Sequence, residues 1–250
     1  MKPGNIIGIG NTAVVYELEY SKPGEEDKVL KLFNAGYPNE AIESEYRNAL
    51  AVRDLNFPKP KAYELADWEG RKGIIYDRIK GTSLLDWVLN TGDVVKCAKY
   101  MADLHNTMIH NSISEVPNYK DFLSYHIQNA PITTKEQIKA MQILEELPEG
   151  DTLCHGDFHP GNIIISEDSA YIIDFMNICQ GNYLYDIART VYLVEYTPVP
   201  EGTGDKAAVL GLKKTLADLY LEQMKVTREM IQDYITLIAI ARRGECPDEG

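Results

Sequence analysis

An aspartate, an asparagine and a second aspartate follow one another at short spacing in the second half of the chain. Asp157 lies in the segment CHGDFHPGN at 154–162, Asn162 ends that segment, and Asp174 follows twelve residues later. Phosphoryl transfer needs a carboxylate that faces the attacking hydroxyl and hard oxygen ligands that hold Mg²⁺ against the phosphates. Asp157 suits the first task, whereas Asn162 and Asp174 suit the second. The three residues therefore predict a Mg²⁺-dependent phosphoryl transfer to a hydroxyl.

Short strands and turns must position these three residues. Apolar runs predict strands at 153–155, 162–165 and 171–173, with glycine, proline and other turn residues between them. Asp157 would then lie on a loop, at an exposed position that a substrate can reach.

The rest of the chain divides into a strand-rich first third and a mainly helical remainder. Alternating or apolar runs predict strands at 6–9, 13–20, 28–33, 62–65 and 73–76, a turn at 21–24 and a helix at 38–55. The spacing of apolar residues predicts helices at 93–106, 120–129, 134–147, 184–196 and 207–243, the last one broken near 226. These elements indicate an α+β fold whose first strands form an antiparallel meander.

Composition and charge narrow the kinds of partner. The 250 residues carry a formal net charge of −13, whereas a groove for nucleic acid would need the opposite sign. The acid excess suits a cationic substrate, and it suits a well solvated surface equally. No apolar run is long enough to span a bilayer, and the first residues lack the apolar core of a signal peptide. We therefore expect a cytoplasmic protein with neither a nucleic acid nor a membrane as partner.

The cysteines agree with a reducing compartment. They are widely scattered, form no CxxC pair and are expected to be free thiols: Cys97, Cys154, Cys179 and Cys246. Cys154, His155 and His159 could suggest zinc, but the proline and glycine that follow indicate a loop. No other Cys/His pair supplies the remaining ligands.

The segment around Asp157 resembles the catalytic and metal-binding loops of the eukaryotic-like kinase superfamily. Its His-Gly-Asp and His-Pro-Gly-Asn sequences are similar to those of the aminoglycoside phosphotransferase and choline kinase branch. Gly156 stands where protein kinases carry an arginine, and Met176 stands where their metal motif carries a glycine. Both departures favour a small-molecule kinase over a protein kinase. The interval from Asp174 to Asp186 is also too short for an activation segment.

The resemblance implies a bilobal, protein-kinase-like fold. Residues 1–79 would form a small N-terminal lobe that binds the nucleotide and contains an antiparallel sheet and one helix. Residues 80–250 would form a larger, mainly helical C-terminal lobe with the catalytic loop. In this family, an insertion and the C-terminal helices build the acceptor site; here the insertion lies between His105 and His155.

Residues of the first lobe would hold the phosphates of ATP or GTP. By the resemblance, Lys31 grips the α- and β-phosphates and Glu45 orients Lys31. Glu43 is the alternative to Glu45, and it lies about 200° away on an ideal helix, so only one of the two points inward. A glycine-rich loop, in which an alanine replaces the third glycine, is assigned to Gly8, Gly10, Asn11, Thr12 and Ala13.

The segment 73–81 resembles the family's linker between the lobes. By this likeness, the backbone C=O of Asp77 and the backbone N–H of Ile79 would contact the purine. Tyr76 would lie at the back of the purine pocket. Because main-chain groups make these contacts, the sequence does not decide between ATP and GTP.

Three polar residues are expected to support the site. His105, in a Leu-His pair common to the superfamily, should be a hydrogen-bonded core residue, and His155 should support the loop backbone. Asp186 looks like the family's Asp-Leu-Ala helix start, where a carboxylate can cap N–H groups and tie down the catalytic loop.

The sequence therefore predicts a phosphotransferase with an alcohol group as acceptor. Asp157 would align the hydroxyl and take its proton, while Asn162 and Asp174 bind Mg²⁺. The acceptor would be a small molecule, and aminoglycosides, amino alcohols, amino acids and sugars all fit. The alternative is a catalytically weak nucleotide-binding regulator of the same fold. No pattern indicates an oligomeric state.

Overall fold

Two compact units make up the chain. A computed structural model describes residues 2–19, 27–167, 169–199 and 204–246. The first unit comprises Met1–Thr82 and Ile164–Asn177, and the second comprises Ser83–Ile163 and Ile178–Gly250. The segment with Asp174 thus belongs to the first unit although it follows the loop with Asp157 in sequence. The functional division into 1–79 and 80–250 stays a prediction.

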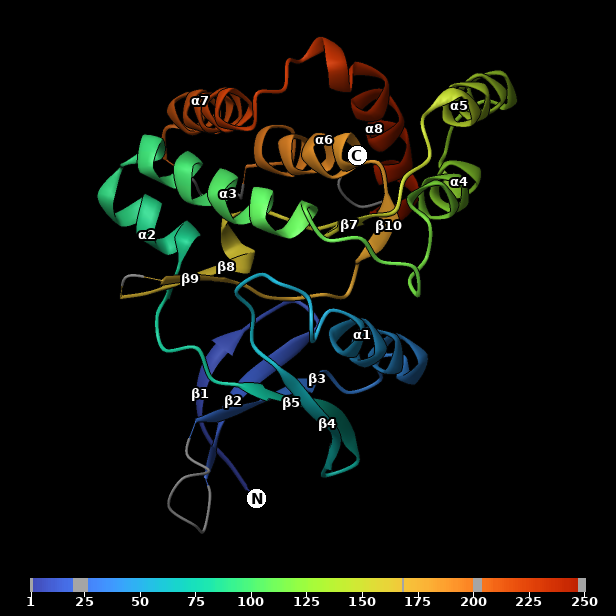
Figure 1. The fold of residues 1–250 in the computed structure, drawn as a ribbon. Helices are drawn as coiled ribbons and strands as arrows, with labels where there is room; N and C mark the ends of the chain where they lie inside the picture. The colour runs from blue at the N-terminus through green and yellow to red at the C-terminus, as the bar shows by residue number, and fades with distance from the viewer. Residues whose placement is uncertain (1, 20–26, 168, 200–203, 247–250) are drawn as a thin grey trace. The chain divides into compact units, whose positions relative to one another are not determined.

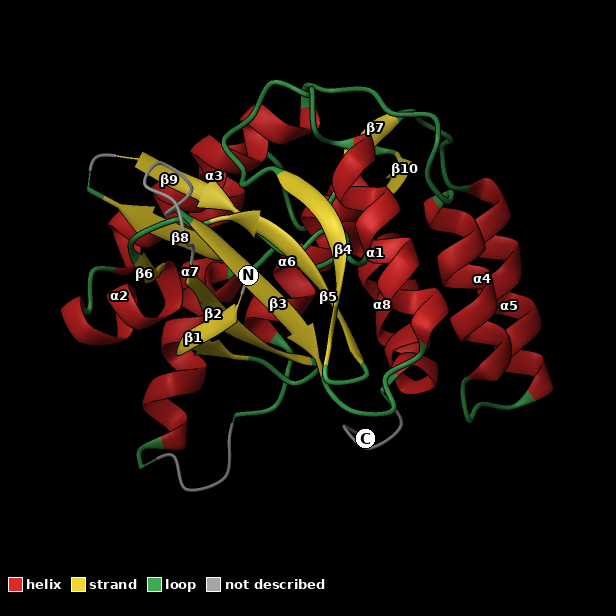
Figure 2. Cartoon of the chain, turned by 90° about the horizontal axis from the view of Figure 1, so that it is seen from below, coloured by secondary structure: helices red, strands yellow, loops and turns green. Residues whose placement is uncertain are grey.

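The first unit contains a five-stranded antiparallel sheet with the strand order β1-β2-β3-β5-β4 (Figure 1). Helix α1 (Asn39–Ala51) packs against β4 and β5 (Figure 2). The predicted turn at 21–24 lies outside the described residues. The strands are β1 (Lys2–Ile9), β2 (Ala13–Glu19), β3 (Lys28–Phe33), β4 (Ala62–Trp68) and β5 (Arg71–Asp77).

Strand β3 lies in the middle of this sheet and alternates between its two faces. Val29 and Phe33 join the apolar cluster that includes Ile42 of α1. Leu30, the residue after Val29, belongs to a second cluster, on the opposite face. Side chains two residues apart share a face of a strand, so Lys31 lies on the α1 face. This alternation brings the lysine to the helix.

A short segment after the loop that contains Asp157 completes the first unit. Strands β8 (Ile163–Ser166) and β9 (Ser169–Ile172) form a small sheet in the order β6-β8-β9, where β6 is Thr82–Ser83. The N–H of Ile172 donates to the carbonyl of Pro58 at 3.0 Å. The amide Nδ2 of Asn48 in α1 donates to the carbonyls of Phe175, at 3.1 Å, and Met176, at 3.0 Å. These bonds fasten the chain on both sides of Asp174.

The second unit is mainly helical. Helix α3 packs against α7, α4 packs against α5 and α8, and α6 contacts both α7 and α8 (Figure 1). A two-stranded sheet pairs β7 (Thr152–Cys154) with β10 (Cys179–Gly181). The other elements are α2 (Leu84–Thr91), α3 (Val94–Ile109), α4 (Tyr119–Asn129), α5 (Thr134–Glu146), η1 (Pro160–Asn162), α6 (Tyr183–Glu195), α7 (Lys206–Met224), η2 (Glu229–Ile231) and α8 (Gln232–Glu245).

The α+β fold with an antiparallel sheet that the sequence predicts is confirmed, and the differences are local. Helix α2 is new, because its eight residues were too few for a helical pattern to stand out. Its ends nevertheless carry signals: Ser83 accepts a hydrogen bond from the N–H of Asp86, and Gly92 adopts a left-handed conformation. None of the described helices is both long and apolar enough to cross a bilayer.

Candidate active site

The loop at 155–162, which the sequence predicts to be catalytic, brings Asp157 and Asn162 together. The amide Nδ2 of Asn162 donates to Oδ2 of Asp157 at 3.1 Å and to the backbone carbonyl of Asp157 at 2.9 Å. The short helix η1 turns the chain so that the two side chains meet. Because Nδ2 faces Asp157, Oδ1 is the amide atom of Asn162 that can ligate a cation. The side chain of Asp157 is 30% exposed, as expected for a residue that a substrate must reach.

His159 also lies beside Asp157, which the sequence did not indicate. Its Nε2 is 3.8 Å from Oδ2 of Asp157, while its Nδ1 accepts a hydrogen bond from the N–H of Gly161. The histidine therefore caps η1 and presents its second ring nitrogen toward the carboxylate.

A fully buried carboxylate holds the backbone before Asp157. Oδ2 of Asp186 accepts from the N–H of His155 at 2.7 Å, and Oδ1 accepts from the N–H of Gly156 at 2.9 Å. Gly156 has a φ of +73°, in the left-handed region that favours glycine. Asp186 therefore ties down the loop as predicted. The cap of α6 is a different residue, because Asn182 accepts from the N–H of Leu184.

His105 completes this buried network as a core residue. Its Nε2 lies 2.8 Å from Oδ2 of Asp186, and its Nδ1 is paired with the hydroxyl of Tyr220. Burial alone would raise the pKa of the Asp186 carboxyl. The hydrogen bond from His105 and the nearby histidines and backbone N–H group outweigh burial, so the pKa of Asp186 lies below its ordinary value. Asp186 is therefore ionised at neutral pH.

The first unit places Lys31 between two carboxylates. Nζ of Lys31 lies 2.7 Å from Oε1 of Glu45 and 3.0 Å from Oδ1 of Asp174. Burial would lower the pKa of Lys31, but the charges of Asp174 and Glu45 outweigh it and raise the pKa above its ordinary value. The lysine is thus a fixed cation. Asp174 itself has a φ of +68°, a conformation uncommon outside glycine.

Glu45, rather than Glu43, is the partner of Lys31. Glu45 is buried, whereas the side chain of Glu43 is 43% exposed and pairs with Lys72 at 2.9 Å. Oε1 of Glu45 also accepts a hydrogen bond from the hydroxyl of Tyr76 at 3.1 Å. Burial and the Glu45 charge raise the pKa of Tyr76 well above its ordinary value, so its hydroxyl stays protonated and donates. The sequence did not indicate this contact.

The glycine-rich loop is a tight connection between β1 and β2. The N–H of Gly10 donates to the carbonyl of Ala13 at 2.9 Å and closes the turn. Asn34, the residue after β3, supports this loop. Its Nδ2 donates to the backbone carbonyl of Asn11, and its backbone N–H donates to the carbonyl of Thr12. Gly8 lies on β1 opposite Val15. The side chain of Ala13 is buried in the core, so this residue presents only its backbone to the loop.

The predicted purine linker begins at the end of β5. Oδ2 of Asp77 accepts from the N–H of Lys61 at 2.9 Å, and Oδ1 accepts from the hydroxyl of Tyr63 at 2.6 Å. Ile79 follows as a half-buried residue. The side chain of Asp77 thus fastens the linker to β4, while its purine contact, like that of Ile79, stays a prediction.

The candidate ligands for Mg²⁺ are chemically suitable. Carboxylate and amide oxygens are the hard ligands that Mg²⁺ prefers, and Asp174 and Asn162 supply one of each. The described residues contain no group of three or more His, Cys, Asp or Glu side chains that could hold a metal. Asn162 belongs to the second unit and Asp174 to the first, so their joint binding of Mg²⁺ stays a prediction.

A model of the phosphotransferase enzyme family matches residues 4–211. The chain belongs to this family. The matched span includes the glycine-rich loop, Lys31, Asp157 and Asp174. A comparison with curated protein sequences finds no match to this phosphotransferase.

Solved structures share the fold of this phosphotransferase family member at low sequence identity. An amicoumacin kinase in complex with AMP-PNP and Ca²⁺ is 17% identical, with a TM-score of 0.61 over 96% of this chain and 79% of that one. An aminoglycoside phosphotransferase, APH(3'')-Id from Streptomyces rimosus, in complex with ADP and streptomycin, is 13% identical, with a TM-score of 0.57 over 91% and 90%. A choline/ethanolamine kinase family protein from Mesorhizobium loti is 12% identical, with a TM-score of 0.52 over 99% and 90%. These likenesses show the kinase-like fold. With the family match, they support a small-molecule phosphotransferase.

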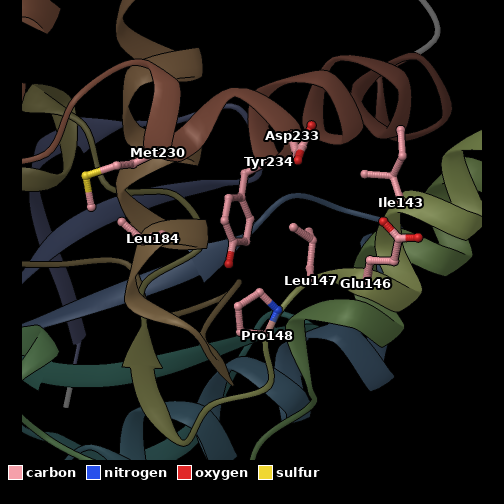
Figure 3. Close-up of a pocket in the computed structure, with 8 residues that line it drawn as sticks. All are labelled: Ile143, Glu146, Leu147, Pro148, Leu184, Met230, Asp233 and Tyr234. Carbon is pink, nitrogen blue, oxygen red and sulfur yellow. The ribbon is translucent and has the colours of Figure 1, made fainter.

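An open pocket with two carboxylates lies in the second unit (Figure 3). Its volume is about 420 Å³, and Glu146 of α5 and Asp233 of α8 are its two acids. Tyr234 projects from α8 toward Pro148 (Figure 3). The pocket is lined by Ile143, Glu146, Leu147, Pro148, Leu184, Met230, Asp233 and Tyr234. An aromatic and apolar wall with two acids is chemically suited to an organic cation.

Proposed function

We propose that this phosphotransferase is a small-molecule kinase that transfers the γ-phosphoryl group of ATP or GTP, with Mg²⁺, to a hydroxyl of a small substrate. The observation that carries the proposal is the half-buried Lys31, held as a cation by Glu45 at 2.7 Å and Asp174 at 3.0 Å. A fixed lysine beside a potential metal ligand suits the binding of a metal-bound polyphosphate. Solved relatives with ADP or AMP-PNP support a nucleotide co-substrate.

The roles of the residues follow from their chemistry. Lys31 binds the α- and β-phosphates, and Glu45 orients it, while the backbone amides of the glycine-rich loop contact the phosphates. Asp174 and Asn162 would hold Mg²⁺, whose charge would offset the negative charge that develops on the phosphate oxygens. The purine would contact the backbone C=O of Asp77 and N–H of Ile79.

Asp157 acts on the acceptor. Its carboxylate aligns the substrate hydroxyl, whose oxygen forms the new bond to the γ-phosphorus as the bond to the bridging oxygen of ADP breaks. The hydroxyl proton passes to Asp157. Asn162 fixes the carboxylate through the 3.1 Å hydrogen bond to Oδ2. Alignment and charge neutralisation would supply most of the rate enhancement.

A screen of ADP release tests the proposal. The full chain is mixed with Mg²⁺ and either ATP or GTP, and a panel of aminoglycosides, amino alcohols, amino acids and sugars is offered as acceptors. We expect acceptor-dependent ADP release with at least one compound. Nucleotide binding without turnover on any acceptor would favour the catalytically weak regulator instead. We also propose that the protein is cytoplasmic, because nucleoside triphosphates are available there and the thiols of its four cysteines stay reduced.

Asp174→Ala is expected to weaken the Mg²⁺-dependent part of nucleotide binding. The variant removes one hard oxygen ligand and the second carboxylate that contacts Lys31. Calorimetric titration with ATP, with and without Mg²⁺, measures the effect. Glu43→Gln is the matched control, because Glu43 is an exposed carboxylate of α1 that pairs with Lys72. Equal affinity of Asp174→Ala and the wild type in Mg²⁺ would contradict the assignment.

The acceptor is proposed to be cationic, with its charge near Glu146 and Asp233. Asp233→Asn and Glu146→Gln should each raise the KM of a cationic acceptor about two- to fivefold, because exposed ion pairs contribute up to about 1 kcal/mol. The KM of a neutral acceptor should stay unchanged. Glu145→Gln, an exposed neighbour outside the pocket lining, is the control. An equal effect on charged and neutral acceptors would place the cation elsewhere.

A further inference from the structure

An arginine of α6 lies wholly inside the second unit and contacts the catalytic loop. Arg189 is 1% exposed, and its Nε donates a hydrogen bond to the backbone carbonyl of Gly156. Its Nη2 donates to Oε1 of Glu245, near the end of α8, at 2.7 Å. The guanidinium therefore joins α8 to the residue that precedes Asp157.

The peptide bond that carries Asp157 is held at both of its polar groups. Arg189 binds its carbonyl, which belongs to Gly156, and its N–H, which belongs to Asp157, donates to Nδ1 of His155 at 3.2 Å. Asp186 separately holds the N–H of Gly156. Gly156 has a left-handed backbone and no side chain that would restrict its dihedral angles. These hydrogen bonds therefore fix the dihedral angles of Gly156. The orientation of this peptide plane decides where the carboxylate of Asp157 points.

Glu245 compensates the charge of the buried guanidinium. A buried charge without a partner is strongly destabilising, so Arg189 depends on this carboxylate. Burial would raise the pKa of Glu245, but the charge and hydrogen bond of Arg189 outweigh it, and the pKa lies below its ordinary value. Arg242 contacts the other carboxylate oxygen at 3.3 Å, and the ring of Phe122 lies 4.8 Å from the guanidinium carbon of Arg189.

The end of α8 has little freedom to move away from these contacts. Gly244 approaches α4 so closely that a Cβ at this position would lie 2.2 Å from the carbonyl oxygen of His126. Tight backbone packing of α8 on α4 therefore fixes the position of Glu245, and through Arg189 it fixes the carbonyl of Gly156.

We propose that Arg189 is a positioning residue for Asp157, and that Glu245 positions Arg189. Together they couple the C-terminal helix to the geometry of the reacting carboxylate. This inference rests on the proposed function, in which Asp157 aligns the acceptor hydroxyl. Lysine cannot replace Arg189, because a single ammonium group on a flexible stem does not reproduce the planar fork that reaches Gly156 and Glu245 at once.

Steady-state kinetics and thermal unfolding of the full chain test the coupling. Arg189→Lys and Glu245→Gln should lower kcat about 10- to 100-fold, since a small misalignment of a reacting group has effects of this size, while the KM of the nucleotide stays near the wild-type value. Glu245→Asp should recover part of the lost kcat.

Arg228→Lys is the matched control, because Arg228 pairs with Glu195 and Asp218, each at 2.6 Å, on other elements of the same unit. It should lower Tm with kcat near normal. A kcat for the folded Arg189 and Glu245 variants equal to that of Arg228→Lys would overturn the proposal.

Hydrogen exchange separates this inference from the proposed function. Peptides spanning 155–158 should exchange faster in Glu245→Gln and Arg189→Lys than in the wild type, at a temperature where all variants are folded, and Arg228→Lys should leave their exchange unchanged. This readout needs no turnover. A wild type without kinase activity would refute the proposed function, whereas unchanged exchange in the Glu245 and Arg189 variants would refute the coupling.

Discussion

Asp157→Asn is expected to lower kcat by about 10²- to 10⁴-fold, the usual contribution of a positioned acid or base, with nucleotide affinity near normal. The amide keeps the size of the carboxylate but can neither take the hydroxyl proton nor attract it through a negative charge. Asp157 belongs to the second unit, whereas Lys31, Glu45 and Asp174 belong to the first, and the substitution leaves these three side chains unchanged. ADP release with a saturating acceptor gives kcat, and calorimetry gives the nucleotide Kd.

The control for this prediction is Asp151→Asn. Asp151 is an exposed aspartate just before β7, six residues from Asp157. It should retain wild-type turnover. Full turnover of Asp157→Asn would contradict the catalytic role of Asp157. A large loss of nucleotide affinity would instead indicate that Asp157 contacts the nucleotide.

Asp186→Ala is expected to lower the free energy of unfolding by about 3–5 kcal/mol at neutral pH. Its carboxylate accepts from the N–H groups of His155 and Gly156 and contacts Nε2 of His105, so alanine leaves three buried donors without this acceptor. Each unsatisfied buried donor costs about 1–3 kcal/mol. Urea unfolding, with the exposed Asp103→Ala as control, measures the difference. Asp103 forms an exposed ion pair with Lys99 at the protein surface.

The effect of Asp186→Ala should depend on pH in a defined direction. Because the pKa of Asp186 is lower in the folded protein than in the unfolded chain, its stabilisation is fully present above the unfolded value of about 3.9. It is lost as pH falls through the lower, folded value. The difference in unfolding free energy between wild type and variant should thus be constant from pH 7 to about 5 and shrink below pH 4. An equal difference at pH 3 and pH 7 would contradict the role of the ionised carboxylate.

The sequence predicted the fold well because its elements carry local patterns. Strand β3 alternates between two apolar faces, and the predicted bounds, 28–33, agree with the structure. The long helical pattern at 207–243 is interrupted where expected, since Lys225 has a left-handed backbone that ends α7. Helix α2 was missed because a short helix gives few repeats of the helical period.

The candidate site was predictable only where its residues lie close in sequence or share a family motif. The spacing of Asp157 and Asn162 indicated that both belong to one site, and the structure adds a hydrogen bond between their side chains. The resemblance favoured Glu45 over Glu43 as the partner of Lys31, and the structure, in which both glutamates lie on α1, pairs Glu45 with the lysine. The bond between Arg189 and Glu245 joins residues 56 positions apart and follows no periodic pattern, so only three-dimensional packing reveals it.

The hydroxyl of Tyr76 and the ammonium of Lys31 both donate to the same oxygen, Oε1 of Glu45. The other oxygen of Glu45 is buried and has no hydrogen-bond partner within the described part of the chain. In the proposed site, Tyr76 lies near the base and Lys31 lies near the phosphates. Oε1 of Glu45 therefore contacts one residue at each end of the nucleotide. Redesigning base preference by shortening this tyrosine would therefore also disturb phosphate binding, and the two properties would have to be re-optimised jointly.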